Sequence, residues 1–424
     1  MNFTLSRLAP LAILFFFSFS ISSLAQNGSS INSAAAGFDA DGLENYEIYL
    51  EKEIAAGRIP GAVSLISRKG HIAHSGAFGY NNMSTKAPMT KDKIFYIQSM
   101  TKPIISIAFM TLYEEGHFFL TDPVSKYLPQ FGDMKVMELG IDENGKTKVD
   151  YVPLDRPIQI WHLLSHTAGF SHGLGNNEYD QKLANLLYGS FGGETTVDHK
   201  TIEDRVNALA SYPLMGQPGK QWNYSASPDV LALLIEHFSG QSTADFLQER
   251  IFDPLGMDDT GYNVSDENMS RLVGLHQMQE DGSLAYAEPW GPIQGNTIYG
   301  GTHGLFSTAH DYMQFGLMLL NNGKYNNQRI IGRKTLELMT ENYIEDLPYS
   351  PGNGFGLGFG IRTDLSDSKI SGSEGIFHWG GAFNTYFFVD QEEDMVAILM
   401  TQSFPYTNLY ASKLRQFVYS AIGD

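Results

Sequence analysis

The spacing of apolar residues along this chain alternates between the period of a helix and the period of a strand. Residues 43–56 have the spacing of an amphipathic helix, and two short β-rich runs follow at 61–67 and 71–76. Residues 68–70, Arg-Lys-Gly, separate these runs and predict a tight turn, so a β-hairpin is the natural interpretation. A further short strand is expected at 93–96, directly before another helix.

The middle of the chain is predominantly helical, and the last third returns to strands. Between residue 120 and about residue 300, helical segments alternate with loops rich in Gly and Asn, such as 173–180. The periodicity predicts further helices at 158–164, 202–209, 228–238, 243–251, 309–320, 334–340 and 409–422, and late strands at 356–362, 375–378, 385–390 and 396–402. Strands at both ends around a helical middle predict an α/β (α+β) fold: one antiparallel sheet is built from both chain ends, flanked by helices and interrupted by a mainly helical insertion.

Residues 1–25 have the pattern of a secretory signal peptide. Arg7 supplies a positive charge, residues 8–19 are nearly all apolar, and Ser23-Leu24-Ala25 forms a small-x-small cleavage site. A membrane anchor is the alternative, but the apolar run is shorter than a full span. We therefore expect a mature protein in the bacterial periplasm or outside the cell, with no stable membrane span.

The remaining residues divide into a short leader and one folded domain. Residues 26–40 are small and polar, which predicts a flexible leader. Residues 41–424 are predicted to form a single domain with an α/β part at about 41–98 and 300–424 and a helical part at about 99–299. The oligomeric state stays open at this stage.

Composition restricts the partners and the chemistry. The formal net charge of −19 at pH 7 argues against nucleic acid and anionic membranes as partners. The chain has no cysteine, which excludes a thiol nucleophile, disulfides and thiolate metal sites. His166, His172 and Asp180 could be imagined as metal ligands, but their spacing fits no metal motif, and solvated histidines in a loop are expected instead. Neither a metal nor an organic cofactor is expected.

Ser99 and Lys102 form a pair that is suited to nucleophilic catalysis. They lie three residues apart at the predicted start of a helix, so both side chains sit on one face, and a helix N-terminus favours nearby negative charge. An amine beside a hydroxyl can hold or shuttle its proton. The same Ser-x-x-Lys pattern recurs at Ser366 and Lys369, in a polar run where no helix is expected, so the spacing alone does not select Ser99.

Three other segments carry candidate chemistry. Residues 218–225, Pro-Gly-Lys-Gln-Trp-Asn-Tyr-Ser, contain Tyr224, which could act as a base beside a cation or belong to a packed aromatic corner. Residues 377–381, Phe-His-Trp-Gly-Gly, could offer an edge amide to an oxyanion or form a simple turn. Residues 169–173, Gly-Phe-Ser-His-Gly, match the Gly-x-Ser-x-Gly nucleophile elbow, but the strand before and the helix after that this motif needs are not predicted here.

Five segments, in this order, resemble the serine β-lactamase and penicillin-binding-protein superfamily. The similarity is greatest to its class C β-lactamase-like branch, which includes the family VIII carboxylesterases. It covers about residues 45–420, and its motifs are 96–102, 163–169, 218–225, 300–311 and 378–381. The resemblance implies that the domain at 41–424 is a β-lactamase-like catalytic domain.

The resemblance also implies roles for individual residues. Ser99 would be the nucleophile that forms an acyl-enzyme, and Lys102 and Tyr224 would share the proton transfer. The amide of Ser99 and one near Gly380 and Gly381 would form the oxyanion hole, and the same strand contributes His378 and Trp379 to the substrate site. A cationic Lys102 would lower the pKa of Tyr224 so that the phenolate accepts the Ser99 proton, although the two roles could be exchanged.

The chain departs from the β-lactamases of this superfamily at two places. Ala226 stands two residues after Tyr224, where they carry asparagine, and His378-Trp379-Gly380 (or Trp379-Gly380-Gly381) replaces their Lys-Thr-Gly. The positive charge that pairs with a β-lactam carboxylate is therefore missing, and such charged hydrogen bonds are typically worth about 1.5–3 kcal/mol each. Trp-Gly-Gly at this place is similar to what several esterases of the superfamily carry.

With the predicted signal peptide at 1–25, these departures favour a secreted serine hydrolase, a carboxylesterase that acts on a small-molecule ester. The alternatives are a β-lactamase or D-amino-acid peptidase of the same fold and, from another class of protein, a non-catalytic homologue that binds peptidoglycan or a partner.

Overall fold

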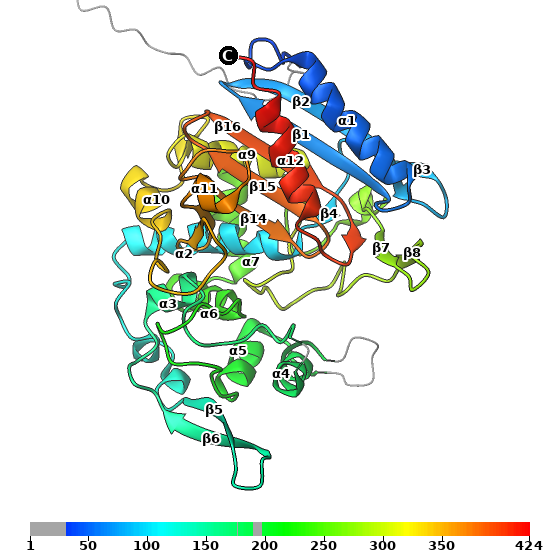
Figure 1. Cartoon of the computed structure of the whole chain (residues 1–424). Helices are drawn as coiled ribbons and strands as arrows, with labels where there is room; N and C mark the ends of the chain where they lie inside the picture. Colours follow the sequence, from blue (N-terminus) through cyan, green and yellow to red (C-terminus); the bar gives the residue numbers. More distant parts are fainter. Residues whose placement is uncertain (1–30, 176, 190–196) are drawn as a thin grey trace, which may run out of the picture. The chain divides into compact units, whose positions relative to one another are not determined.

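In the computed structural model, which describes residues 31–175, 177–189 and 197–424, the largest sheet is antiparallel and has eight strands (Figure 1). The predicted signal peptide at 1–25 lies outside the described residues. The strand order is β12-β13-β14-β15-β16-β1-β2-β3. These strands are β1 (Gly61–Arg68), β2 (His71–Asn82), β3 (Ala87–Pro88), β12 (Asn353–Phe355), β13 (Gly360–Arg362), β14 (Phe377–Gly381), β15 (Thr385–Asp390) and β16 (Met395–Met400).

The two ends of the chain meet in the middle of this sheet. β1 pairs with β16 from Val63 opposite Met400 to Arg68 opposite Met395, so an N-terminal strand and a C-terminal strand are direct neighbours. β1 and β2 form the predicted hairpin. The prediction of one antiparallel sheet built from both chain ends is confirmed.

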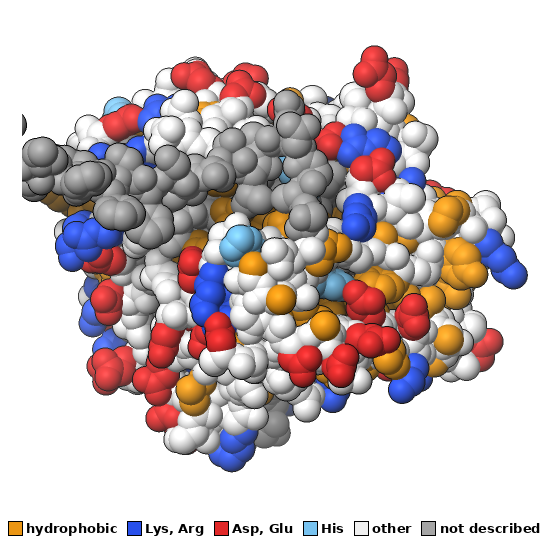
Figure 2. Space-filling model, turned by 90° about the horizontal axis from the view of Figure 1, so that it is seen from above, with side chains coloured by type: hydrophobic (Ala, Val, Ile, Leu, Met, Phe, Trp, Pro, Cys, Tyr) orange, Lys and Arg blue, Asp and Glu red, His pale blue; other side chains and the backbone are white. Residues whose placement is uncertain are grey.

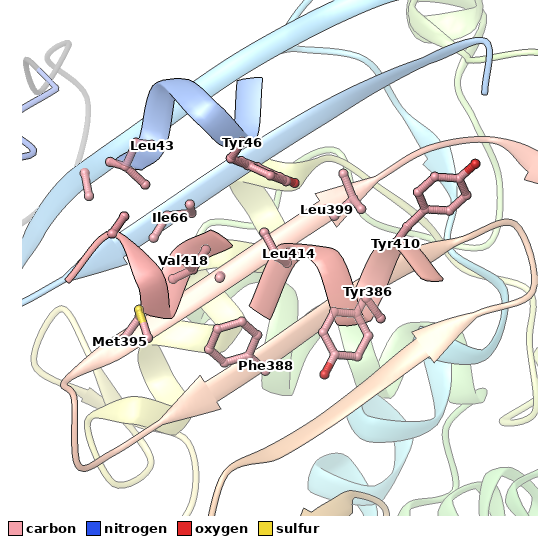
Figure 3. Close-up of a cluster of buried hydrophobic side chains, with 14 of the residues drawn as sticks. Leu43, Tyr46, Ile66, Tyr386, Phe388, Met395, Leu399, Tyr410, Leu414 and Val418 are labelled. Atoms are coloured by element: carbon pink, nitrogen blue, oxygen red, sulfur yellow. The ribbon is translucent and has the colours of Figure 1, made fainter. Parts of the chain in front are cut away.

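Helices cover both faces of the sheet. α1 (Ala40–Ala55) and α12 (Leu409–Ser420) pack together on one face, and α9 (Ala309–Leu320) packs on the other against β15, β16 and β1 (Figure 1). Figure 3 shows the apolar cluster between the sheet and the first pair of helices, which includes Leu43, Leu414, Val418, Ile66, Phe388 and Leu399. Full burial of one such side chain is worth about 1.5–3 kcal/mol, so this cluster holds both ends of the chain on the same sheet.

A predominantly helical part lies between the two halves of the sheet in the sequence. α2 (Thr101–Glu114) connects the sheet to this part through its packing against α6 (Ser227–Ser239). The other helices are α3 (Ile160–Leu164), α4 (Glu178–Tyr188), α5 (Ile202–Ala210), α7 (Thr243–Leu247), α8 (Asp253–Leu255), α10 (Arg333–Met339) and α11 (Leu365–Ser368). The smaller strands are β4 (Phe95–Tyr96), β5 (Lys135–Ile141), β6 (Thr147–Pro153), β7 (Leu275–Met278), β8 (Leu284–Ala287), β9 (Phe306–Ser307), β10 (Lys324–Tyr325), β11 (Gln328–Arg329) and β17 (Ser403–Phe404).

Several elements differ from the sequence prediction. The β5–β6 hairpin and the β7–β8 pair were not predicted, because most of their side chains are exposed or only partly buried and the apolar alternation is weak. The predicted loop at 173–180 overlaps the start of α4, where Asn177 caps the helix by accepting hydrogen bonds from the amides of Tyr179 and Asp180. Asparagine is common both in loops and at helix N-caps, so its presence alone did not distinguish the two.

Four further predictions of elements or their boundaries need correction. The strand predicted at 356–362 is formed only by its last three residues, β13, and the helix predicted at 243–251 continues beyond α7 as a π-helical turn, Gln248–Phe252. Ser366 lies in a short helix, α11, that had not been expected. The expected flexible leader is described from residue 31 onward, and there Ala36 and Phe38 are buried, with Phe38 bridged to Ile422. The packed part of the chain therefore begins before residue 40.

The surface carries charges of both signs. On the face shown in Figure 2, the visible Lys and Arg side chains are scattered among Asp and Glu and form no continuous basic area among the described residues. Within residues 31–175, 177–189 and 197–424, no helix has both the length and the apolar character needed to cross a bilayer.

Candidate active site

Ser99 lies in a tight turn between β4 and α2. Residues Gln98–Met100 form a single 3-10 turn, and Gln98 has a φ of +48°, which is uncommon for a residue with a side chain. The amide of Met100 donates to the Ile97 carbonyl over 3.0 Å, and the hydroxyl of Tyr312 donates to the Met100 carbonyl over 2.9 Å. This turn leaves Ser99 half-buried while its two neighbours in the chain are buried.

Lys102 lies in the first turn of α2 and faces Ser99, as the spacing predicts. Its side chain is 2% exposed, and Nζ donates to Ser99 Oγ over 3.1 Å and to the Thr302 carbonyl over 2.7 Å. Burial lowers the pKa of Lys102 to about 7, an effect that the carboxylate of Asp229 opposes. Near neutral pH a large fraction of this lysine is therefore an uncharged amine, which can accept a proton.

A buried carboxylate holds the segment that positions Lys102. Asp229 is 1% exposed; its Oδ1 accepts from the Thr302 amide over 2.8 Å, and its Oδ2 lies 3.5 Å from Nη1 of Arg205. Gly301 lets this segment approach α6, because a Cβ there would lie 2.0 Å from the Pro228 carbonyl oxygen. Sequence reasoning found the glycines of this segment but not Asp229, since nothing local to residue 229 points to Thr302.

Tyr224 faces the same site. The Nζ of Lys102 lies 4.5 Å from the centroid of its ring. Burial raises the pKa of Tyr224 above its ordinary value, and interactions with the side chains of Ser99 and Trp379 oppose that shift only in part. Tyr224 is therefore a neutral phenol at neutral pH. The free amine of Lys102 and the neutral phenol of Tyr224 are the reverse of the sequence hypothesis, in which Lys102 is the cation and Tyr224 the phenolate.

Two histidines complete the walls around Tyr224. The ring of His172 stacks on Tyr224 at 5.0 Å, and the ring of His166 lies 5.0 Å from it at an angle. Burial, with a contribution from the charge of Lys102, holds the pKa of both histidines well below the ordinary value, so both are neutral. His166 Nδ1 accepts from the Ser225 amide over 3.2 Å. Sequence reasoning favoured solvated loop histidines over metal ligands here; this was wrong, because both rings are buried, and it missed their contact with Tyr224.

Strand β14 borders the site on its other side. Trp379 points toward Tyr224, with ring centroids 5.5 Å apart, and packs edge-on against Phe355 at 5.2 Å. Gly381 lies directly against the turn before Ser99, because a Cβ there would be 2.3 Å from the Ile97 carbonyl oxygen. The structure therefore brings Gly380 and Gly381 next to the nucleophile turn, where an oxyanion amide was expected.

The side chain of His378 does not join this group. Successive residues of a strand point to opposite faces, so His378 faces away from Trp379. Its ring packs against Tyr386 at 5.6 Å, on the face of the sheet that α12 covers. Any contribution of residue 378 to the Ser99 site has to come from its backbone.

The competing serines lie in other surroundings. Ser171 Oγ donates to the carboxylate of Asp180 and accepts from the Gly173 amide over 3.1 Å. These hydrogen bonds stabilise the local loop. Ser366 Oγ donates to Asp364 over 2.8 Å on an exposed helix. No group of three or more potential metal ligands occurs among the residues that the structure describes.

A serine, a buried lysine and a half-buried tyrosine at the junction of an antiparallel sheet with a helical part define a serine hydrolase site of the β-lactamase fold. The sequence profile of the Beta-lactamase family matches residues 48–416, so the chain belongs to this family of serine hydrolases.

Similar proteins cover almost the whole chain. An uncharacterized protein of Mycobacterium tuberculosis is 28% identical over 378 residues, 86% of this chain and 90% of that protein. Esterase EstB of Burkholderia gladioli is 25% identical over 403 residues, 88% of this chain and 94% of the esterase. The solved structure of EstCE1, a hydrolase with promiscuous acyltransferase activity, matches with a TM-score of 0.74 at 24% identity, over 92% of this chain and 100% of EstCE1, which shows the shared fold.

Proposed function

We propose that this protein is a secreted or periplasmic carboxylesterase that acts through an acyl-enzyme on Ser99. The observation that carries the choice of an ester is the side chain that β14 presents to Tyr224. It is Trp379, a neutral aromatic ring packed on Phe355, and it belongs to the segment 378–381 that replaces the Lys-Thr-Gly of the β-lactamases in either register. Esterase EstB among the relatives supports the same choice. Secretion rests on the sequence of residues 1–25 alone.

The geometry supports a specific acylation step. The uncharged amine of Lys102 accepts the Ser99 proton across the 3.1 Å contact as Oγ attacks the ester carbonyl. The backbone amides of Ser99 and of the Gly380–Gly381 segment would stabilise the oxyanion. The phenol of Tyr224 donates its proton to the leaving alkoxide, and the proton held by Lys102 then restores the phenol.

Deacylation reverses these roles. A water molecule attacks the acyl carbonyl and gives its proton to the Lys102–Tyr224 pair, and Ser99 Oγ takes a proton back as the carboxylic acid leaves. Lys102 and Tyr224 therefore end each turnover in the protonation states in which they began.

A substrate panel tests the proposed function. We expect the purified protein to hydrolyse short p-nitrophenyl esters with a kcat/KM that exceeds that for nitrocefin by about 10- to 150-fold, because a missing charged hydrogen bond to the β-lactam carboxylate costs about 1.5–3 kcal/mol. Initial rates on esters, lactones, nitrocefin and D-alanyl peptides at one pH make the comparison. A preference for nitrocefin or for the D-peptides would contradict the choice of an ester.

The pH profile tests the order of the two pKa values. We expect kcat/KM for an ester to rise with pH through about 7, because the free Lys102 amine is formed as the ammonium with that pKa loses its proton. The raised pKa of Tyr224 keeps the phenol protonated, so no decline should follow in the mildly alkaline range. Initial rates between about pH 5.5 and 9 measure this profile. A rate that is constant across the acid limb would exclude Lys102 as the base.

A further inference from the structure

Two arginines are buried behind β14, on the face of the sheet that α12 covers. Arg362 is the last residue of β13 and is 1% exposed, and Arg415 lies on α12 and is 6% exposed. Within the described residues, Nε and Nη1 of both guanidiniums are buried without a hydrogen-bond partner. The arginines that do form ion pairs there are Arg58, Arg68, Arg205, Arg250, Arg271, Arg329 and Arg333.

The two guanidiniums share their surroundings with two other unpartnered polar groups. In the sheet register His378 lies opposite Gly360, and Tyr386 lies opposite Gly380, so strand alternation puts Arg362, His378 and Tyr386 on one face. Arg415 Cζ lies 5.7 Å from the ring centroid of Tyr386, and the His378 ring lies 5.6 Å from it. The His378 Nε2 and Tyr386 hydroxyl atoms are also buried and have no hydrogen-bond partner in the described part of the chain.

The groups in this cluster are suited to donate hydrogen bonds. Burial, reinforced by the charges of Arg415 and Arg362, holds the pKa of His378 well below its ordinary value, so the ring is neutral and carries one N–H. Arg362 and Arg415 bring two positive charges, and Tyr386 adds a hydroxyl that can donate. Figure 3 shows this hydroxyl pointing away from Leu414 and Leu399, out of the apolar cluster.

The surrounding side chains do not supply the missing negative charge. Asp390 lies on the same face, but its carboxylate already accepts from Ser373 Oγ over 2.8 Å, from the Tyr419 hydroxyl over 2.5 Å and from the backbone amides of Glu392 and Glu393. The contact of Arg415 with the Tyr386 ring offsets only part of the cost of removing a guanidinium from water. Two like charges near each other in a poorly solvated region raise that cost further.

We propose that Arg362, Arg415 and Tyr386, bordered by His378, form a binding site for a small inorganic anion, a halide or a tetrahedral oxyanion. Near-complete burial of both arginines restricts the ligand to a small one, and two positive guanidiniums whose Nε and Nη1 have no hydrogen-bond partner among the described residues favour an anion. The site is distinct from the Ser99 site, since His378 and Trp379 are consecutive on β14 but point to opposite faces. It does not depend on the proposed esterase activity.

Thermal unfolding of the mature protein tests the site. We compare Tm in sodium gluconate, sodium chloride and sodium phosphate at equal pH and ionic strength. The wild type should gain roughly 3–5 °C in chloride or phosphate over gluconate when the anion is about 100-fold above its Kd. Arg362→Met and Arg415→Met should lose this gain. In gluconate both variants should be at least as stable as the wild type, because each removes an unpaired buried charge.

A matched control and a direct observation make the result decisive. Arg333→Met removes an exposed arginine that pairs with Glu337, so it should keep the full anion response and reports any general salt effect. In crystals soaked in bromide, an anomalous peak beside both guanidiniums supports a halide site; a Tm gain only in phosphate supports an oxyanion site. An equal salt response in the wild type, Arg362→Met and Arg333→Met, with no peak, would overturn the proposal. Neither readout involves ester hydrolysis, so failure here would leave the proposed function untouched.

Discussion

Replacing Ser99 with alanine is expected to lower kcat/KM for a p-nitrophenyl ester by at least about 10⁴-fold, because loss of a catalytic nucleophile typically removes most of the acceleration. Oγ is the only atom removed, and it lies 3.1 Å from the Lys102 amine that would take its proton. Covalent labelling by a fluorophosphonate probe, read by intact mass, should disappear in the same variant. Ser99 is half-buried in a turn held by backbone hydrogen bonds, so Tm should change little.

Two control variants separate Ser99 from its sequence rivals. Ser366→Ala removes the serine of the identical Ser-x-x-Lys pattern, but Ser366 donates to Asp364 on an exposed helix, so full activity should remain. Ser171→Ala breaks the contact with Asp180 in a loop and should reduce stability more than activity. An active Ser99→Ala protein together with an inactive Ser171→Ala protein would restore the nucleophile-elbow interpretation of residues 169–173.

The sequence predicted the sheet well because its signals are local. β15 and α9 were predicted with their observed bounds, at 385–390 and 309–320. α9 begins after Thr308, whose side chain accepts from the Asp311 amide, and this capping pattern can be read from the sequence. Apart from its last residue, Asp390, β15 consists of β-branched and aromatic residues, which is the composition that distinguishes strands from loops.

The sequence could also place Ser99, Lys102, Tyr224 and Trp379 together, since each lies in a recognisable segment. It could not order their pKa values, because the order depends on burial, and burial is a property of the fold. It could not separate the two faces of β14 either. His378 and Trp379 were assigned to the same pocket, and the pleat of the strand sends His378 toward Tyr386 instead. The role of Asp229 could not be predicted either, because its partner, Thr302, is distant in sequence.

Replacing Lys102 with methionine should separate catalysis from stability. The change keeps an unbranched side chain that is only one atom shorter and removes the amine, so we expect kcat to fall by roughly 10³-fold through the loss of general-base catalysis. Lys102→Arg is the matched control. It keeps a positive charge but cannot deprotonate at working pH, so a base role predicts that it is as inactive as the methionine variant. Retention of activity in Lys102→Arg would show that only the charge is needed.

The same Lys102→Met variant should be more stable than the wild type, and the gain should depend on pH. Burial lowers the pKa of Lys102 from 10.5 to about 7. The unfolded chain therefore binds more protons than the folded one between these values, and the burial of this amine costs about 4 kcal/mol of stability at pH 7. The methionine variant also loses the hydrogen bond that Nζ donates to the Thr302 carbonyl. This loss offsets part of the gain in stability, typically about 1–3 kcal/mol. Denaturant unfolding should show the advantage of the methionine variant shrinking as pH rises from 7 toward 10.5, where the unfolded lysine also gives up its proton. An advantage that stays constant over this range would mean that Lys102 keeps its proton in the folded protein, and the amine could not then be the base.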